Sequence, residues 1–591
     1  MNSLISRRFR LVAAAALAVA ALAGGERARA DKVPAGVPKN PDDRTILHVL
    51  NRLGFGARPG DVERLRRIGL DAYIEQQLHP DRIPETTIAS RLAQFETLGK
   101  SSGELARDYF VPAMEARQRA QRQAAADGQK DAAAASGDDA KRMRTPEQME
   151  LQRKERAVLA ELSEQKILRA AYSDRQLEEV MTDFWFNHFN VFAGKGPTQV
   201  YLTEYERDVI RPRALGRFHD LLEATATSPA MLFYLDNWQS VDPDMEARLA
   251  RERLQPRGGF GSPFGRPRMR RPGLFPPRPS TGSGRPEPVE GRPQPRAGQP
   301  AANAQRPKRG LNENYGRELM ELHTLGVDGG YTQHDVVDVA RCFTGWTIAN
   351  PRQGGGFRFE PRMHDAGPKV VLGHKIKAGG GRDDGEHVLD ILAKHPATAR
   401  FISTKLVRRF VSDTPPPSLV SRAAARFQQT DGNIREVLKT IFTSPEFYAA
   451  DAYRAKVKSP FEFIVSAVRA TGADVQNALP LVQTARQLGE PLYMCQPPTG
   501  YKDTADAWVN TGALLNRMNF ALALASGKMR GVEAAANAAV PAATAESVRT
   551  YLVNAVLAND ISSATQSTLA KALDPRQAAA LVLGSPEFQR R

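Results

Sequence analysis

Residues 312–346, NENYGRELMELHTLGVDGGYTQHDVVDVARCFTGW, combine two predicted helices and a glycine turn in one short stretch. The first helix begins after Asn312 or after the asparagine two residues on, because both are good N-caps, and it stops at Gly326, which tolerates a left-handed backbone. After the turn, Thr332 caps the second helix, with Asp335 in the reciprocal position of a capping box. The stretch therefore predicts a capped helix pair and favours a helical fold.

A helical wheel, at about 100° per residue, gives the first helix two neighbouring faces. The apolar face carries Tyr315, Leu319 and Leu322, and the polar face carries Asn314, Glu318 and Glu321. Two carboxylates one turn apart repel each other unless a cation, a metal or a shared proton lies between them. One interpretation is that Arg317 and Arg341 neutralise the acids, or that the face is solvated. The other is a polar site set into a helical core.

We take Glu318 and Glu321 as candidate catalytic groups, together with His364 and Asp365 on a predicted loop. A His-Asp pair can ligate a metal or act as a base with its orienting partner. The alternative is a turn in which Asp365 hydrogen-bonds to its own backbone. His323 does not strengthen a metal site, because it lies roughly 140–160° around the helix from both glutamates. The cofactor therefore stays open, with a divalent metal as one option.

A polar stripe runs along residues 181–192, MTDFWFNHFNVF, on an otherwise aromatic helix. Asp183, Asn187 and Asn190 stand at i, i+4 and i+7, and buried polar groups so placed either cap other helices or line a site. His188 lies beside the stripe, either as a hydrogen-bonded core histidine or as part of the same site. We count Asp183, Asn187 and His188 as candidate binding residues, together with the asparagine of the glutamate face, Asn314.

The two flanks of a long low-complexity insert carry Asp or Asn next to aromatic residues, which suits the rim of a pocket. We therefore add Asp236, Asn237 and Trp346 to the candidate binding residues. Trp346, Trp508 and Tyr501 can present flat apolar surface to a sugar ring, although core packing is the commoner use of such side chains.

The first thirty residues have the features of a secretory signal peptide. Arg7, Arg8 and Arg10 form a basic n-region, residues 11–23 are rich in Ala, Leu and Val, and 28–30 is a small-x-small cleavage site. The arginine pair is also a partial twin-arginine signal, so the Sec and twin-arginine routes both stay open. We expect an exported bacterial protein, periplasmic or extracellular, with no transmembrane span in the mature chain.

The net charge of +16 at pH 7 is concentrated in two segments. Residues 251–309 hold 14 lysines and arginines against three glutamates, and residues 1–30 hold five arginines against one glutamate. The rest of the chain is therefore close to neutral. We expect no nucleic-acid partner, and we assign the basic segment 251–309 to contacts with an anionic envelope surface or with another exported protein.

The chain has two cysteines, Cys342 and Cys495. In an oxidising compartment they can form a disulfide that closes a loop of about 150 residues. They can equally remain two buried free thiols. The sequence leaves both alternatives open.

Apolar residues recur at helical spacing along most of the chain, for example at 59–78, 384–411 and 459–487. We predict a mainly α protein whose first segment, 1–30, is a signal peptide. The helical body consists of an N-terminal part at 31–244 and a C-terminal part at 310–591. A disordered Pro/Gly/Arg-rich insert at 245–309 separates the two parts. A second low-complexity segment, 117–146, is either an extended helix or disordered. The β signal is confined to 356–376, which predicts one small hairpin.

Five blocks of sequence occur in order along the chain. They are HVLNRLGFGARPGDVERLRRIGLDAYIEQQL at 48–78, FWFNHFNVF at 184–192, the stretch at 312–346, KVKSPFEFIVSAVRATGA at 456–473 and AWVNTGALLNRMNFAL at 507–522. Together they resemble the large bacterial family called domain of unknown function 1800, over nearly the whole chain. The resemblance implies an exported protein, often encoded beside a sulfatase-like exported family. It implies no established activity and no catalytic residues.

The sequence contains no Walker loop, haem-attachment motif or His-Glu-x-x-His pattern. Two function classes remain. The first is an exported envelope factor that binds or helps assemble a partner, with a sulfatase-like exported protein as the partner that the resemblance suggests. The second is a metal-assisted, hydrolase-like enzyme that acts on an envelope polymer or glycan. Its site would combine Glu318, Glu321, Asp183, His188, His364 and Asp365.

Overall fold

The computed structural model describes residues 36–128, 145–245, 310–534 and 544–591. Helices dominate these ranges, and the strands within them form three two-stranded antiparallel sheets, so the predicted mainly α architecture is confirmed. The predicted signal peptide, the insert at 246–309 and residues 129–144 lie outside the described part of the chain. Among the described residues, no helix is both long enough and apolar enough to cross a membrane.

The N-terminal part consists of helices joined by short turns. Its α-helices are α2 (Asp43–Leu53), α3 (Asp61–Ile68), α4 (Leu70–Leu78), α5 (Thr86–Leu92), α6 (Ser102–Leu105), α7 (Val111–Gly128), α8 (Pro146–Tyr172), α9 (Gln176–His188), α10 (Leu202–Glu204), α11 (Phe218–Ala226) and α12 (Pro229–Tyr234). Single 3-10 or π-helical turns lie at η1 (Pro80–Arg82), η2 (Ala106–Phe110), η3 (Gly196–Val200), η4 (Tyr205–Ile210), η5 (Arg211–Arg213) and η6 (Asn237–Gln239).

The C-terminal part adds more helices and all the strands. They are α14 (Glu313–Glu318), η7 (Leu319–Thr324), α15 (Gln333–Cys342), β1 (Trp346–Ile348), β2 (Phe357–Phe359), η8 (Pro361–Met363), β3 (Lys369–Val371), β4 (His374–Ile376), α16 (Arg382–Lys394), α17 (Pro396–Phe410), α18 (Pro417–Gln429), α19 (Ile434–Phe442), α20 (Pro460–Thr471), β5 (Asp474–Val475), α21 (Leu479–Gln487), η9 (Ala505–Ala507), α22 (Thr511–Ala525), β6 (Val532–Glu533), α23 (Ala545–Leu557), α24 (Ser563–Leu569) and α25 (Pro575–Leu583).

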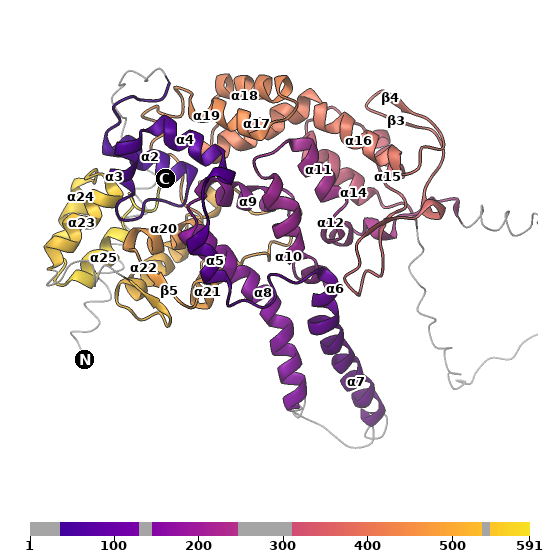
Figure 1. Ribbon diagram of the computed structural model, residues 1–591, viewed down its shortest axis with the longest axis horizontal. Helices are drawn as coiled ribbons and strands as arrows, with labels where there is room; N and C mark the ends of the chain where they lie inside the picture. The colour runs from indigo at the N-terminus through magenta and orange to yellow at the C-terminus, as the bar shows by residue number, and fades with distance from the viewer. Residues whose placement is uncertain (1–35, 129–144, 246–309, 535–543) are drawn as a thin grey trace, which may run out of the picture.

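One hydrophobic core joins the two parts. It contains buried residues from α2 near the start of the described chain and from α25 near its end. Helix α2 lies beside α23, so the indigo and yellow ends of the ribbon are neighbours in Figure 1. Apolar side chains from both parts therefore fill the same core.

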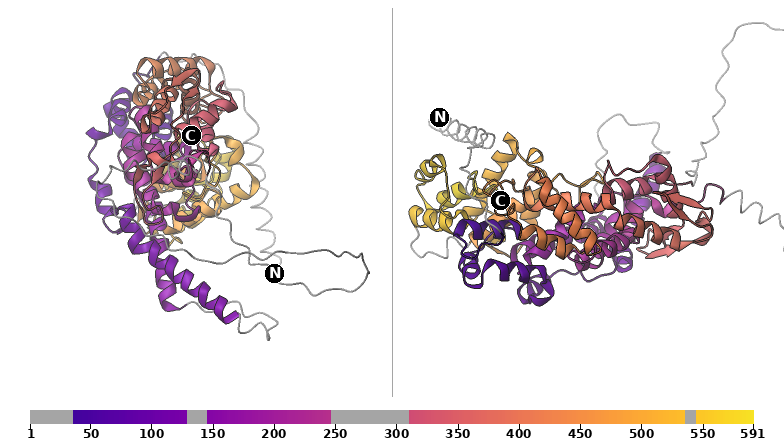
Figure 2. Two further views of the ribbon diagram at one scale, coloured as in Figure 1. Left: turned by 90° about the vertical axis from the view of Figure 1, so that its right-hand side faces the viewer. Right: turned by 90° about the horizontal axis from the view of Figure 1, so that it is seen from above.

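Two long helices, α7 and α8, project from this body as a pair (Figures 1 and 2). Arg117 of α7 donates two hydrogen bonds to the Glu155 carboxylate of α8, at 2.6 and 3.0 Å. Helix α8 starts in a capping box formed by Thr145 and Gln148. Within the low-complexity segment 117–146, the residues up to Gly128 are therefore helical, as in the extended-helix alternative. The next helix begins at Pro146.

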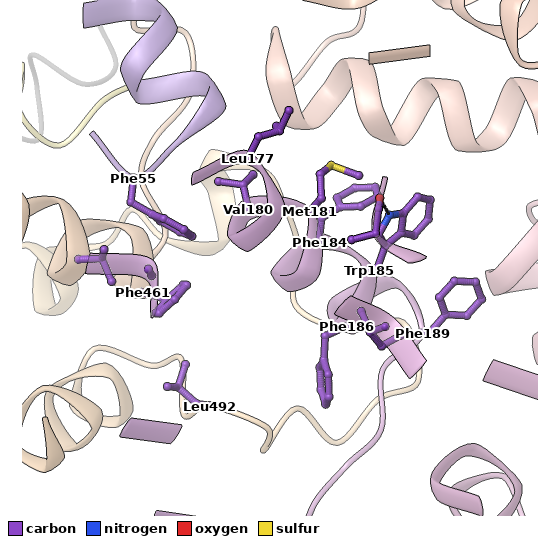
Figure 3. Close-up of a cluster of buried hydrophobic side chains, with 14 of the residues drawn as sticks. Phe55, Leu177, Val180, Met181, Phe184, Trp185, Phe186, Phe189, Phe461 and Leu492 are labelled. Atoms are coloured by element: carbon purple, nitrogen blue, oxygen red, sulfur yellow. Dashed lines mark hydrogen bonds between the residues drawn. The ribbon is translucent and has the colours of Figure 1, made fainter. Parts of the chain in front are cut away.

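Helix α9 lies inside the core. Figure 3 shows Trp185, Phe186 and Phe189 leaving this helix on different sides. The indole nitrogen of Trp185 donates to the Ala214 carbonyl at 2.8 Å. The ring of Phe186 meets the ring of Tyr493 edge-on, with 4.9 Å between centroids. Since the helix is covered on most of its circumference, its few polar side chains must find partners in the interior.

The capped helix pair at 312–346 forms largely as predicted. The Asn312 side chain accepts from the Asn314 amide at the start of α14, and Thr332 and Asp335 form the capping box of α15. Gly326 has a φ of +82°, the left-handed conformation expected after the first helix. One feature differs from the prediction, because the second half of the first helix is the π-helical turn η7.

Two long predicted helices are divided in the structure. The segment 384–411 becomes α16 and α17, because Pro396 has no amide hydrogen to continue α16 and instead starts α17 at its first turn. The segment 459–487 becomes α20 and α21, because Gly472 ends α20 with a φ of +60° and strand β5 follows. Helical spacing alone does not detect such breaks.

The small hairpin predicted within 356–376 is present as β3 and β4. Strand β2 pairs with β1, which places Trp346 opposite Phe359, whereas β3 pairs with β4. The β3–β4 hairpin turns through Leu372 and Gly373, whose φ angles of +49° and +81° suit a two-residue turn. The small β region is therefore two sheets, and a third sheet, β5–β6, lies elsewhere.

Candidate functional site

A cavity of about 260 Å³ lies where α9, the second half of α17 and the loops at 456–459 and 490–508 meet. We call it the α9–α17 pocket. Charged side chains reach it from four segments: Lys166 of α8, Asp183 of α9, Arg408 of α17 and Glu490 of the 490–508 loop. Two of the predicted binding residues, Asn187 and His188, also line it.

A wider hollow of about 640 Å³ lies beside α3 and the end of α20. Its buried and half-buried cations already have partners: Arg58, for example, lies 2.5 Å from the Asp174 carboxylate, and buried Arg469 donates to the Gly56 and Ala171 carbonyls at 2.8 Å. We therefore take the α9–α17 pocket, whose charges are less completely paired, as the candidate site.

The polar stripe of α9 holds one wall of the pocket in place. Asn187 donates to the Tyr501 carbonyl at 2.8 Å and accepts from the Tyr501 amide at 2.7 Å. Asn190 donates to the carbonyls of Cys495 and Pro497 at 2.9 and 2.8 Å. Both amides therefore fix the 490–508 loop, so the stripe satisfies backbone groups and lines a site at the same time.

Gly500 lets this loop approach α9. Its φ is +72°, and a Cβ at this position would lie 2.2 Å from the backbone oxygen of Asn187. Only glycine combines that conformation with that distance. The close approach is what allows Asn187 to reach the Tyr501 backbone.

Lys166 and Asp183 form a half-buried ion pair on one side of the pocket, with 2.7 Å between Nζ and Oδ1. The ammonium group also lies 5.2–5.6 Å from the ring centroids of Phe186, Phe461 and Tyr493. Burial disfavours its charge, but Asp183 and Glu206 outweigh burial, and the pKa of Lys166 is raised. Lys166 is therefore protonated at neutral pH.

Glu490 is 9% exposed and faces the same side of the pocket. Burial raises its pKa to about 7, and the nearby Asp183 carboxylate adds to the effect. One carboxylate oxygen accepts from the Phe461 amide at 2.8 Å. Near neutral pH this group exists in both protonation states, so it can donate or accept a proton.

On the opposite side, Lys405 meets His188. The Nε2 atom of His188 lies 3.1 Å from the His323 carbonyl, which can only accept, so Nε2 carries the hydrogen. Burial, with Lys405 nearby, holds the pKa of His188 well below its usual value, and the ring is neutral. Its Nδ1 atom therefore accepts from Lys405 Nζ at 2.8 Å.

The second half of α17 leaves positive charge uncompensated in the pocket. Burial lowers the pKa of Lys405 to about 8, although Asp503 acts in the opposite direction. Arg409 pairs with Glu462 at 2.6 Å, whereas Arg408 donates only to the Asp413 carbonyl, at 3.4 Å. Within the described part of the chain, neither Lys405 nor Arg408 forms an ion pair with a carboxylate. The pocket is therefore suited to an anion.

The predicted catalytic pair His364 and Asp365 belongs to a different network. Buried His364 lies 3.1 Å from the Asp384 carboxylate, which also accepts from Lys369 at 2.6 Å. Asp365 accepts from Arg341 at 2.6 Å and from the Gly367 amide at 2.8 Å. The second bond is the turn alternative, in which Asp365 binds its own backbone. Neither residue lines the α9–α17 pocket.

Glu318 and Glu321 lie half-buried on the first helix of the pair, and Asn314 is exposed beside them. Burial raises the pKa of Glu318, and Glu321 adds to the shift. Arg341 does not neutralise these acids, because it pairs with Asp338 at 2.7 Å and with Asp365 at 2.6 Å. Neither glutamate lines the pocket, so the six acids and histidines combined in the enzyme hypothesis are not brought together: only Asp183 and His188 line it.

The predicted rim residues are structural. Asp236 has a left-handed backbone and accepts from Lys195 at 2.6 Å. Buried Asn237 donates to the Phe343 and Trp346 carbonyls at 3.1 Å. Trp346 is fully buried against Phe343, so the sugar-platform role suggested for it is wrong. Tyr501 and Trp508, the other two aromatic candidates, do line the pocket.

Cys342 and Cys495 are both free and buried, so the disulfide alternative is not realised. Among the described residues, no group of three or more His, Cys, Asp or Glu side chains could hold a metal ion. The described part of the chain therefore offers no set of ligands for the divalent metal considered from the sequence.

Three residues that carry the pocket's charge were missed in the sequence: Lys405, Arg408 and Glu490. A signal exists for the first two, because positions 405, 408 and 409 place three cations on one side of a helix whose other side is apolar. Glu490 lies in a loop, where no periodicity marks it.

Comparison with known proteins identifies the family. A family model described as "Protein of unknown function (DUF1800)" matches residues 48–590, so this chain belongs to that family. No curated protein and no solved structure matches the chain. The matched range includes every residue of the α9–α17 pocket.

Proposed function

We propose that this protein is an exported binding factor and that the α9–α17 pocket holds a small anionic ligand. The observation that carries the proposal is the pair Lys405 and Arg408, which line the pocket from one turn of α17 without a carboxylate partner. Both side chains are half-buried, and a partly desolvated cation without a counter-ion gains from an anionic ligand that pairs with it. Residues 1–30, which have the features of a signal peptide, support export.

The pocket also offers aromatic surface next to these cations. The rings of Tyr501 and Trp508 are inclined to each other, with centroids 6.0 Å apart, and both line the cavity. Aromatic faces bind the apolar face of a sugar ring, and charged groups select its acidic substituent. We therefore propose a sugar acid, or another small carboxylate of similar size, as the ligand class.

A thermal-shift comparison tests the ligand class. Glucuronate is expected to raise the melting temperature of the mature protein in a concentration-dependent way, whereas glucose, which has the same ring but no carboxylate, is not. Arg408→Gln should abolish the shift. Arg400→Gln, an exposed position on the same helix, is the matched control and should keep it. Equal shifts with both sugars would contradict an anion site.

We also propose an exported protein partner, of the sulfatase-like type that the resemblance suggests, or an anionic envelope surface. The support is the basic segment 251–309, which lies outside the described residues. Deletion of 251–309 is expected to abolish capture of the partner or of anionic vesicles while glucuronate binding is retained. If the deletion variant still captures the partner and the vesicles, segment 251–309 does not bind them.

An acid–base hydrolase acting on an envelope glycan is the second candidate. It is favoured by Glu490, because burial and the nearby Asp183 carboxylate raise its pKa to about 7. A carboxyl group with such a pKa can donate or accept a proton near neutral pH. Hydrolysis of an anionic glycan that is lost in Glu490→Gln would favour it, and equal activity in that variant would exclude this role for Glu490.

A further inference from the structure

Lys405 is half-buried and combines a place in the pocket lining with a fixed orientation of its amine. Its Nζ atom lines the α9–α17 pocket and donates one hydrogen bond to His188 Nδ1, at 2.8 Å. His188 cannot rotate freely, because its other nitrogen is engaged by the His323 carbonyl at 3.1 Å. In the neutral amine, one N–H is therefore held by the imidazole, and the lone pair is directed away from it.

The surroundings of Lys405 favour the neutral amine more than those of a surface lysine do. The charged or titratable groups that face it are His188 of α9, His323 of η7, Arg408 of its own helix and Asp503 of the 490–508 loop. Only Asp503 stabilises the ammonium form, and burial and Arg408 oppose it. Desolvation beside a second cation is a known way to activate a lysine as a nucleophile.

We propose that Lys405 is a nucleophilic amine that forms an imine with a small oxo acid held in the pocket. The proposal rests on the proposed anionic ligand site, and it narrows the ligand to anions that also carry an aldehyde or ketone. The carboxylate of the oxo acid would lie against Arg408, which lines the cavity one turn along α17. That contact would leave the carbonyl carbon for Lys405.

The step balances without any further reactant. The Nζ lone pair attacks the carbonyl carbon, a C–N bond forms as the C=O π bond breaks, and the nitrogen loses a proton while the oxygen gains one to give a carbinolamine. Loss of one water molecule from the carbinolamine leaves the C=N bond of the imine. Over the whole step, one amine and one carbonyl compound give one imine and one water, and no oxidation occurs.

This reactivity requires both a neutral amine and open space beside it, and two other lysines each meet only one of these requirements. Lys166 lines the same pocket, but it is held as an ammonium ion by Asp183 at 2.7 Å. Burial lowers the pKa of Lys458 to about 7, yet this lysine donates to Ser466 at 2.7 Å and lines a cavity of only about 10 Å³. Lys166 therefore has room for a ligand but no neutral amine. Lys458 has a neutral amine but no room for a ligand.

Reductive trapping tests the proposal. The mature protein is incubated at pH 8 with glyoxylate and cyanoborohydride, and the carboxymethylated lysines are identified by peptide mass spectrometry. Lys405 is expected to react on the order of tenfold to 100-fold faster than surface lysines, because a pKa of about 8 gives a far larger free-amine fraction than about 10.5. Lys166 and Lys458 should react no faster than the surface average. The Lys405 rate should level off above about pH 8.

Two variants and a second aldehyde distinguish imine formation at Lys405 from anion binding in the pocket. Arg408→Gln should slow the reaction of Lys405 with glyoxylate but not with acetaldehyde, which has no carboxylate. Lys405→Arg, which lacks a nucleophilic amine, should abolish the adduct. A glyoxylate-induced shift in wild-type protein without preferential modification of Lys405 would overturn the imine and leave the anion site standing. Absence of both the shift and the adduct would overturn the anion site as well.

Discussion

Asn187 and Tyr501 exchange two hydrogen bonds between a side-chain amide on α9 and a backbone in the 490–508 loop, at 2.8 and 2.7 Å. The two residues are 314 positions apart in sequence. This contact joins a core helix of the N-terminal part to the loop that carries Glu490, Tyr501 and Trp508. The pocket therefore exists only when the two parts of the chain have come together.

Removal of this contact should loosen the loop. Asn187→Ala leaves the Tyr501 amide and carbonyl without their partner, and we expect a loss of about 1–3 kcal/mol in the free energy of unfolding. Urea denaturation measures the change. Asn314→Ala, at an exposed position, serves as the control and should change stability by no more than about 0.5 kcal/mol. If Asn187→Ala is as stable as its control, this contact does not hold the loop.

Gly316 tests the close packing of the helix pair. A Cβ here would lie 3.0 Å from both the Ala340 amide nitrogen and the Val336 carbonyl oxygen of α15. We expect Gly316→Ala to destabilise the protein by about 1–3 kcal/mol, because crowding against backbone outweighs the gain in helix propensity. Gly103→Ala is the matched helical control, since its nearest atom would be 3.9 Å away. Equal thermal stability of the two variants would show that α14 and α15 can separate at no cost.

Glu490 should make stability depend on pH. Burial raises its pKa from the ordinary value of 4.5 to about 7 in the folded protein, so the folded state binds the proton more tightly than the unfolded state. Stability from this group is then fully present below about pH 4.5 and falls as pH rises toward 7. The advantage of Glu490→Gln over wild type should grow across that window, by about 1–3 kcal/mol, and stay constant above it. Parallel stability curves from pH 5 to 8 would contradict the shifted pKa.

The two cysteines should react as free thiols only after unfolding. Burial raises the pKa of Cys342 to about 12 and that of Cys495 to about 11, so thiolate is scarce at neutral pH. A thiol reagent should label the native protein slowly, and Cys342 more slowly than Cys495, because Cys495 borders the pocket. In denaturant without reductant, both thiols should react. Absence of labelling in denaturant would reveal a disulfide.

Local signals in the sequence were sufficient for the helix pair at 312–346. The caps at Asn312 and Thr332 and the left-handed Gly326 depend only on residues a few positions away, and all three occur as predicted. The π-helical turn η7 was not foreseen, because a wheel assumes a constant angle per residue.

Strand pairing and the site depend on contacts between distant residues, which explains the errors there. The β signal was confined to 356–376, whereas Phe357–Phe359 pairs with the strand that begins at Trp346, outside that range. Asp183, Asn187 and His188 were found from their spacing on one helix. Lys405 and Glu490 become part of the same pocket only through the fold.

Isothermal titration calorimetry of glucuronate against wild-type protein, Arg408→Gln and Arg400→Gln tests the central claim most directly. The account predicts saturable one-site binding to wild-type protein and to Arg400→Gln, and a loss of about tenfold or more in affinity for Arg408→Gln, because a charge-assisted hydrogen bond is worth about 1.5–3 kcal/mol. Equal affinities for all three proteins, or no saturable binding to wild-type protein, would contradict a ligand site for anions in the α9–α17 pocket.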